Sequence, residues 1–142
     1  MGNPEARGIR NNNPGNIRND PANLWHGQTG IDGKGFCTFY SMASGVRALL
    51  MILHNKYYRD GLVTIEQIVS SYAPPTENNT PSYITAVATG MGRDPNAMLS
   101  PPSDMGMLAA HILRHESGFT DYTPAVLQGQ YNNYFQAPKE TT

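Results

Sequence analysis

The sequence predicts an α+β fold that is mostly helical and carries one small β-hairpin. Residues 41–59 and 105–117 repeat apolar side chains at helical spacing. Residues 24–40 instead contain short β-prone pieces separated by glycines. A chain of 142 residues is long enough to bury a hydrophobic core, so we expect one domain.

The N-terminal part is predicted to contain loops and the hairpin. Residues 1–6 should form a flexible lead. Residues 7–18 follow, and a tight turn at residues 13–16 interrupts this segment. The Asp-Gly pair at Asp32 suits a hairpin tip. Strand alternation then places Cys37 and Phe39 on one face. The other face would carry Phe36, Thr38 and Tyr40.

Helices are expected to fill the rest of the domain. The strongest is residues 41–59, with Ser41 as N-cap, and it is expected to be the central core helix. Thr64 and Gln67 have capping-box form and should open a short helix to about Tyr72. Three later helices are predicted from Thr80 to Gly90, from Ser103 or Asp104 to Gly118, and from Thr123 to about Gln130.

The C-terminal segment, residues 131–142, has no helical period and is predicted to be a peripheral arm. The compact domain would therefore cover residues 7–130. Tyr131, Tyr134 and Phe135 in the arm could dock a neighbouring protein.

Charge and composition argue against several functional classes. A net charge near -1 gives no electrostatic footprint for nucleic acid, so we expect no nucleic-acid partner. No stretch approaches the roughly 20 apolar residues of a membrane span. The first residues show no secretory signal, so synthesis in the cytoplasm without a signal peptide is expected. Cys37 is the only cysteine, which leaves neither a disulfide framework nor a cysteine metal cluster.

Glu116 is the main candidate for a catalytic group. It continues the apolar stripe of its helix, four residues after Ile112 and three after Leu113. A core-facing carboxylate is costly to ionise, so its pKa should rise. Gly118 would end the helix and leave this acid at the mouth of a groove, as a glycosidic general acid requires. The alternative is that Glu116 frays into solvent.

Cleavage of a glycosidic bond can also need a second carboxylate. Glu77 lies beside a predicted helix start, where an anion is favoured and its pKa should fall. Asp32 at the hairpin tip is the other candidate. Either could orient water or face the cationic sugar, although Glu77 could equally anchor its helix and Asp32 could simply form its turn.

Aromatic residues could complete a sugar groove. Tyr83 could place its hydroxyl in the cleft, and Trp25 and Tyr72 could present flat faces to a sugar. Packing in the core is the alternative for all three.

A metal site is the competing chemistry. His111 and His115 are four residues apart on a helix, and Glu116 follows the second of them. A zinc-protease helix places its glutamate directly after the first histidine, and no third ligand stands at a telling spacing. We therefore expect no catalytic metal and no organic cofactor.

Residues 7–18, 73–80 and 115–118 together resemble a group of small bacteriophage and prophage proteins. These are usually labelled virion structural proteins and are similar to lysozyme-like domains. The resemblance runs from about Arg7 to about Gln130, and it implies a virion location and other virion proteins as partners. Its Asn-rich motifs make Asn13, Asn16 and Asn78 candidate substrate-binding residues, with Asp32, Trp25 and Tyr72. The family tends to have Trp where Tyr72 stands and Asn where Ser117 stands. The first departure weakens the case for Tyr72 as a sugar platform.

Residues 116–118 also resemble the helix end of lytic transglycosylases and bacterial glucosaminidases, where Ser follows a catalytic Glu. In glucosaminidases an Asn-rich segment, a β-element and a Tyr-bearing helix come later, whereas here they come first. This order resembles a circular permutation of a lysozyme-like core, which requires the chain ends to lie close together. The resemblance gives Glu116 the general-acid role and Tyr83 the place of the supporting tyrosine.

These observations lead to two hypotheses. The first is a peptidoglycan-cleaving glycosidase carried in a phage virion, acting on glycan strands in the cell wall or periplasm. A lytic transglycosylase would need Glu116 alone, and a hydrolase would also need Glu77 or Asp32. The second is a virion structural or glycan-binding protein without turnover on the same fold.

Overall fold

The computed structural model describes residues 6–74 and 78–136. In chain order its elements are α1 (Arg7–Arg10), β1 (Gln28–Ile31), β2 (Cys37–Phe39), α2 (Met42–Tyr58), α3 (Ile65–Tyr72), α4 (Thr80–Met91), α5 (Met105–Ser117), α6 (Pro124–Tyr131) and the π-helical segment η1 (Asn132–Gln136). The predicted α+β, mostly helical class is therefore confirmed.

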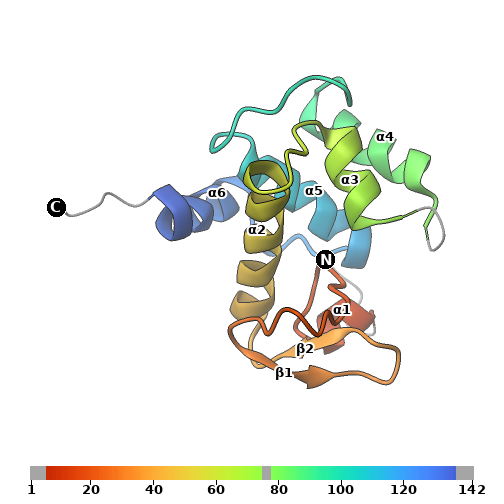
Figure 1. Cartoon of the computed structure of the whole chain (residues 1–142), viewed down its shortest axis with the longest axis vertical. Coiled ribbons are helices and arrows are strands. Elements are labelled where there is room, and N and C mark those ends of the chain that lie inside the picture. Colours follow the sequence, from red (N-terminus) through yellow and green to blue (C-terminus); the bar gives the residue numbers. More distant parts are fainter. Residues whose placement is uncertain (1–5, 75–77, 137–142) are drawn as a thin grey trace, which may run out of the picture.

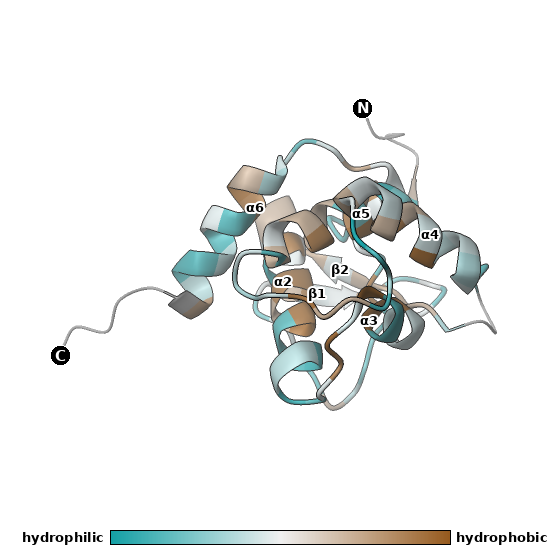
Figure 2. Ribbon diagram, turned by 90° about the horizontal axis from the view of Figure 1, so that it is seen from above, coloured by the Kyte–Doolittle hydropathy of each residue, from teal (hydrophilic) through white to brown (hydrophobic). Residues whose placement is uncertain are grey.

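The helices pack around α5 and α2. Helix α5 contacts α1, α2, α4 and α6, and α2 contacts α3, α5 and β2. The small lobe formed by α1 and the hairpin lies at the N-terminal end of α2, and α3 and α4 lie toward its other end (Figure 1). Figure 2 shows hydrophobic segments on α2, α4 and α5, and α5 packs against both of the other two helices. Residues 41–59 were expected to form the central core helix, but α2 shares this central position with α5.

Three predicted helix starts are confirmed by their capping hydrogen bonds. The Ser41 hydroxyl accepts from the Ser44 N–H at 3.1 Å. Thr64 and Gln67 form a complete capping box at the start of α3. The Thr123 hydroxyl accepts from the Val126 N–H at 3.1 Å at the start of α6.

The start and end of α4 differ from the prediction. Its N-cap is Asn79, whose side chain accepts from the Ser82 N–H at 3.2 Å. Thr80 lies inside the helix because its hydroxyl donates instead to the Ala73 carbonyl at 2.6 Å. The helix continues past the predicted stop to Met91, and Gly92 ends it in the left-handed region at φ 65°.

Asp104 stands at the N-cap of α5 but makes no side-chain capping bond. Its carboxylate accepts from the Ser100 N–H at 2.6 Å and from the Arg93 guanidinium at 2.8 Å. Its carboxylate therefore binds the loop before α5 and does not cap the first turn of the helix.

The hairpin has the predicted antiparallel form, with Ile31 paired to Cys37 and an irregularity between Gln28 and Gly30. Cys37 and Phe39 are buried, as the alternation predicted for one strand face.

The two described chain ends contain structure that the sequence analysis did not predict. Residues Arg7–Arg10 form the short helix α1. Tyr131, assigned to the arm, is the buried last residue of α6, and its hydroxyl lies 2.7 Å from His54 Nδ1. The Phe135 ring stacks on His54 at 3.9 Å. The compact body thus extends to Phe135; most of the predicted lead and the end of the predicted arm lie outside the described residues.

Among the residues that the structure describes, no helix combines the length and hydrophobicity needed to cross a lipid bilayer.

Candidate functional site

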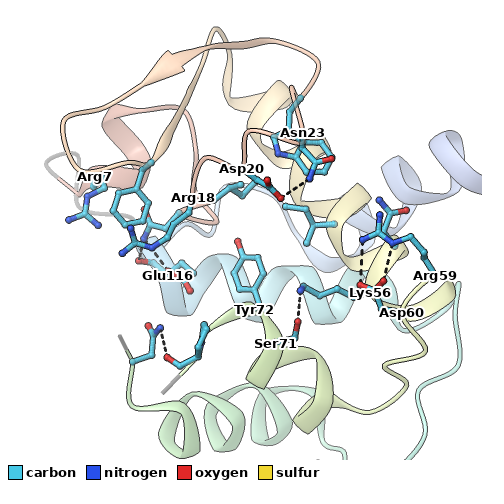
Figure 3. Close-up of a pocket in the computed structure, with 18 residues that line it drawn as sticks. Arg7, Arg18, Asp20, Asn23, Lys56, Arg59, Asp60, Ser71, Tyr72 and Glu116 are labelled. Carbon is cyan, nitrogen blue, oxygen red and sulfur yellow. Dashed lines mark hydrogen bonds and ion pairs between the residues drawn. The ribbon is translucent and has the colours of Figure 1, made fainter. Parts of the chain in front are cut away.

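An open cleft of about 600 Å³ lies between the N-terminal loops with α2 on one side and α3 with the segment after it on the other. Its lining includes Asn16, Trp25, Tyr72, Asn78 and Glu116. Figure 3 shows Glu116 at one end of the cleft, Tyr72 in the middle, and Arg59 and Asp60 at the other end. Glu116 is the predicted acid. The predicted substrate-binding residues in the lining are Asn16, Trp25, Tyr72 and Asn78.

Glu116 occupies the last turn of α5, directly before the helix ends at Gly118 with φ 65°. Its side chain is partly buried and held by two donors instead of fraying into solvent. The Tyr83 hydroxyl donates to Glu116 Oε2 at 2.9 Å. Asn16 Nδ2 donates to Glu116 Oε1 at 3.2 Å and to its main-chain carbonyl at 3.1 Å.

Burial raises the pKa of Glu116 above its ordinary value. The hydrogen bonds from Tyr83 and Asn16, and the positive charge of Arg7, act in the opposite direction on this pKa because they favour the ionised form. Burial is the largest effect, so the net shift is upward. The carboxyl group is therefore easier to protonate than an exposed glutamate while its orientation is fixed.

Tyr83 supports Glu116 from the protein interior. Its side chain is almost fully buried, and its ring stacks on His115 with 3.8 Å between ring centres. Burial and the nearby Glu116 charge raise the pKa of Tyr83, so its hydroxyl stays protonated and can serve as a donor. The Tyr83 hydroxyl is one of the candidates for the cleft itself, but the cleft lining does not include Tyr83.

The three other candidates in the cleft have different surroundings. The Tyr72 hydroxyl donates to the Gly15 carbonyl, which joins α3 to the N-terminal loop. Trp25 is half-buried in the opposite wall. Asn78 Nδ2 donates to the Pro74 carbonyl at 3.3 Å.

Asn13 does not face the cleft, so its predicted role in substrate binding is not supported by its position. The side chain is fully buried, accepts from the Ile17 N–H at 2.9 Å, and donates to the carbonyls of Cys37 and Ile17 at 3.0 Å each. An amide with these partners fixes the N-terminal loop against the hairpin.

Asp32 lies outside the cleft lining and forms the hairpin turn. Its carboxylate accepts from the N–H groups of Lys34 at 2.8 Å and Phe36 at 2.9 Å, and from Asn11 Nδ2 at 2.9 Å. These hydrogen bonds, led by that of Phe36, lower its pKa to about 2. The structure does not bring it to Glu116. Glu77, the other predicted second carboxylate, lies outside the described residues.

Charged residues that the sequence analysis did not single out also line the cleft: Arg7, Arg18, Asp20, Lys56, Arg59 and Asp60. Arg7 and Arg18 are the first and last residues of the motif at residues 7–18. Their place in this motif is the sequence feature that could have marked them as site residues.

The two histidines considered as metal ligands have separate surroundings. A side chain added at Gly90 would overlap the His111 ring, whereas the His115 ring stacks on Tyr83. Within residues 6–74 and 78–136, no group of three or more His, Cys, Asp and Glu side chains could hold a metal ion.

No protein-family model matches the sequence. The chain is similar to Protein P5 of Pseudoalteromonas phage PM2, with 36% identity over 124 residues that cover 85% of this chain and 77% of that protein. The predicted bacteriophage origin is supported by this similarity. This protein belongs to the phage protein family that includes Protein P5 of phage PM2.

Proposed function

We propose that this protein is a peptidoglycan-cleaving glycosidase carried in a phage virion, with Glu116 as its general acid. The observation that carries the proposal is a carboxyl group of raised pKa, fixed by two donors, in the wall of an open cleft. It would act locally on glycan strands in the cell wall or periplasm, after synthesis in the host cytoplasm.

In this mechanism the protonated Glu116 gives its proton to the leaving glycosidic oxygen. Tyr83 and Asn16 keep the carboxyl group in one orientation, so that the donating oxygen does not have to be ordered when substrate binds. The aromatic side chains of Trp25 and Tyr72 give the cleft apolar surfaces on which sugar rings can pack.

The surroundings of the other carboxylates favour a lytic transglycosylase. Besides Glu116, Asp20 and Asp60 are the carboxylates that line the cleft within the described residues. Asp60 pairs with Arg59 at 2.9 Å, and Asp20 accepts from Asn23 and from the Ala22 N–H. In a transglycosylase Glu116 itself would next accept the proton of the muramyl 6-hydroxyl as base, and no second carboxylate is needed.

We further propose that the domain is a circularly permuted lysozyme-like core. Supporting this, the end of α5, the Asn-rich N-terminal loop and α4 meet at one carboxyl group through Glu116, Asn16 and Tyr83. These are the same three pieces that resemble glucosaminidases in a different chain order.

The test is the release of soluble fragments from purified peptidoglycan by wild type and by Glu116→Gln, from mildly acid to mildly basic pH. Wild type should release 1,6-anhydro muropeptides, and Glu116→Gln should release none. The matched control is Glu66→Gln, at an exposed glutamate in the first turn of α3, which should keep wild-type activity. Products with reducing ends would instead identify a hydrolase. If wild type releases nothing at any pH, the enzymatic proposal is wrong.

The second candidate is a virion structural or glycan-binding protein without turnover. It is compatible with the same contacts, because the partners of Asp20 and Asp60 leave neither carboxylate free to act in hydrolysis. Under this function wild type and Glu116→Gln would bind glycan strands and neither would cleave them.

A further inference from the structure

Two arginines lie over one phenylalanine ring at the Glu116 end of the cleft. The guanidinium carbon of Arg7 is 4.1 Å from the centre of the Phe36 ring, and that of Arg18 is 4.3 Å from it. All three residues line the cleft, and Figure 3 shows Arg7 and Arg18 at the same end of it as Glu116. Two positive charges are therefore concentrated beside the proposed acid.

The backbone around this stack is fixed by several hydrogen bonds. Phe36 is only 7% exposed and forms an isolated β-bridge with Arg18. The Cys37 N–H donates to the Ile17 carbonyl at 2.9 Å, and the Asn19 N–H donates to the Gly35 carbonyl at 2.8 Å. The loop that carries Arg18 is thus tied to the hairpin on both sides of the ring.

The chemistry of a stacked guanidinium suits an anionic ligand. Stacking uses the flat face of the group, and the N–H groups of a guanidinium lie in its plane with a spacing that matches the two oxygens of a carboxylate. The charge of Arg7 lowers the pKa of both Glu116 and Asp32, so its field reaches the proposed reaction centre. The net charge of the chain is only -1, so the two arginines beside one ring do not follow from an overall basic composition.

We propose that Arg7 and Arg18 form a subsite for a carboxylate group carried by the glycan beside the bond that Glu116 protonates. This inference rests on the proposed function and deepens it. Peptidoglycan has two sources of such a group: the lactyl substituent where the peptide has been removed, and the stem peptide where it is present. Chitin strands have the same backbone linkage and carry neither. The subsite would therefore make the cleft select wall glycan over neutral glycan.

The test measures binding to the full-length Glu116→Gln protein, which prevents turnover. Three tetrasaccharides are compared by calorimetry: neutral chitotetraose, the peptide-free GlcNAc–MurNAc repeat, and the same repeat with stem peptides. We expect at least one of the two carboxylate-bearing repeats to bind about tenfold more tightly than chitotetraose. This is the effect of about one charge-assisted hydrogen bond. Preference for the peptide-free repeat would assign the lactyl group, and preference only for the peptide-bearing repeat would assign the stem peptide.

Arg7→Gln and Arg18→Gln, each added to Glu116→Gln, should reduce the ratio of acidic to neutral affinity by about tenfold. Arg114→Gln is the matched control, because Arg114 is exposed on α5 and outside the cleft lining. If either arginine variant fails to fold, the salt dependence of the parent protein tests whether its preference is electrostatic. Its preference should shrink between about 0.05 and 0.5 M NaCl, where the screening length falls severalfold.

Equal binding of all three sugars, unchanged in the arginine variants, would overturn the carboxylate subsite and leave the glycosidase proposal standing. Binding of none of them would overturn both proposals.

Discussion

The Glu116 carboxyl group is destabilised in its ionised form by the fold that surrounds it, since burial raises its pKa. In an unfolded chain glutamate ionises near pH 4.5. Between that pH and the higher pKa of the folded state, the native protein binds more protons than the unfolded chain. The contribution of Glu116 to the free energy of unfolding therefore falls as pH rises through this window and levels off above it.

Glutamine at this position cannot ionise and escapes that loss. We expect Glu116→Gln to gain stability relative to wild type as pH rises, by about 1.4 kcal/mol for each unit of pKa elevation. Urea unfolding of both proteins at about pH 4 to pH 8 measures the difference. A difference that does not change with pH would mean that the folded state does not raise the pKa of Glu116.

Tyr83 makes the opposite contribution to the same pKa. Its hydrogen bond favours the ionised carboxylate and so lowers the pKa of Glu116. Tyr83→Phe should therefore raise that pKa further, at a cost of about 1 kcal/mol in stability. Carbon-13 NMR titration of the glutamate carboxyl groups measures the shift.

The control for this titration is Tyr131→Phe, which removes another buried hydroxyl, the one that lies near His54. It should leave the Glu116 titration unchanged. A lower pKa of Glu116 in Tyr83→Phe would show that Tyr83 stabilises the protonated form of Glu116 instead of the ionised form.

At the scale of elements, helix α2 packs directly against the loop that leads to Asn16. A Cβ added at Gly45 would overlap the Asn12 carbonyl oxygen and lie 3.2 Å from Asn13 Cα. We expect Gly45→Ala to destabilise the protein by about 1–3 kcal/mol, because backbone must move to make room. This outweighs the roughly 1 kcal/mol that alanine gains over glycine in a helix.

Gly129 in α6 provides the matched comparison, since nothing lies within 4 Å of a Cβ added there. Gly129→Ala should stabilise by about 0.5–1 kcal/mol. Thermal unfolding of the two variants beside wild type gives both values. Destabilisation of similar size in both would mean that close packing of α2 on the loop is not the cause.

The helix starts that were predicted correctly are those whose capping residues bond nearby backbone. Ser41, Thr64 and Thr123 each bond the backbone of their own first turn, so neighbouring residues suffice to predict them. Helix α1 has only four residues and contacts α5, so its formation depends on residues far along the chain. The start of α4 was misplaced by one residue because the Thr80 hydroxyl has a partner seven residues away.

At the scale of the whole molecule, the candidate site joins segments that only the fold brings together. The helical period predicted that Glu116 would be held against the core, which is a local property. Its partners Tyr83 and Asn16 stand 33 and 100 residues away. Both were candidate site residues, Tyr83 for the cleft and for a supporting role and Asn16 for substrate binding, but the hydrogen bond from Asn16 to Glu116 was not predicted. Periodicity gave no reason to place Arg7 and Arg18 over Phe36, because that contact depends on how α1 meets the hairpin.

The cleft lies between parts of the molecule that a bound glycan would connect, so binding should stabilise the whole fold. Trp25 is the single tryptophan of the chain and is half-buried in the cleft wall, so its fluorescence reports on this site. We expect a bound wall tetrasaccharide to shift the Trp25 emission of Glu116→Gln to shorter wavelength. At about 100 times its dissociation constant the ligand adds about 2.7 kcal/mol, which raises Tm by several degrees.

Adding Trp25→Phe should remove the emission change while leaving a measurable rise in Tm, because a flat ring remains in the cleft wall. The two signals in Glu116→Gln should also saturate at the same ligand concentration, since one binding event causes both. A rise in Tm without any change in Trp25 emission would place the bound glycan on another surface, and the cleft beside Glu116 would then lose its role.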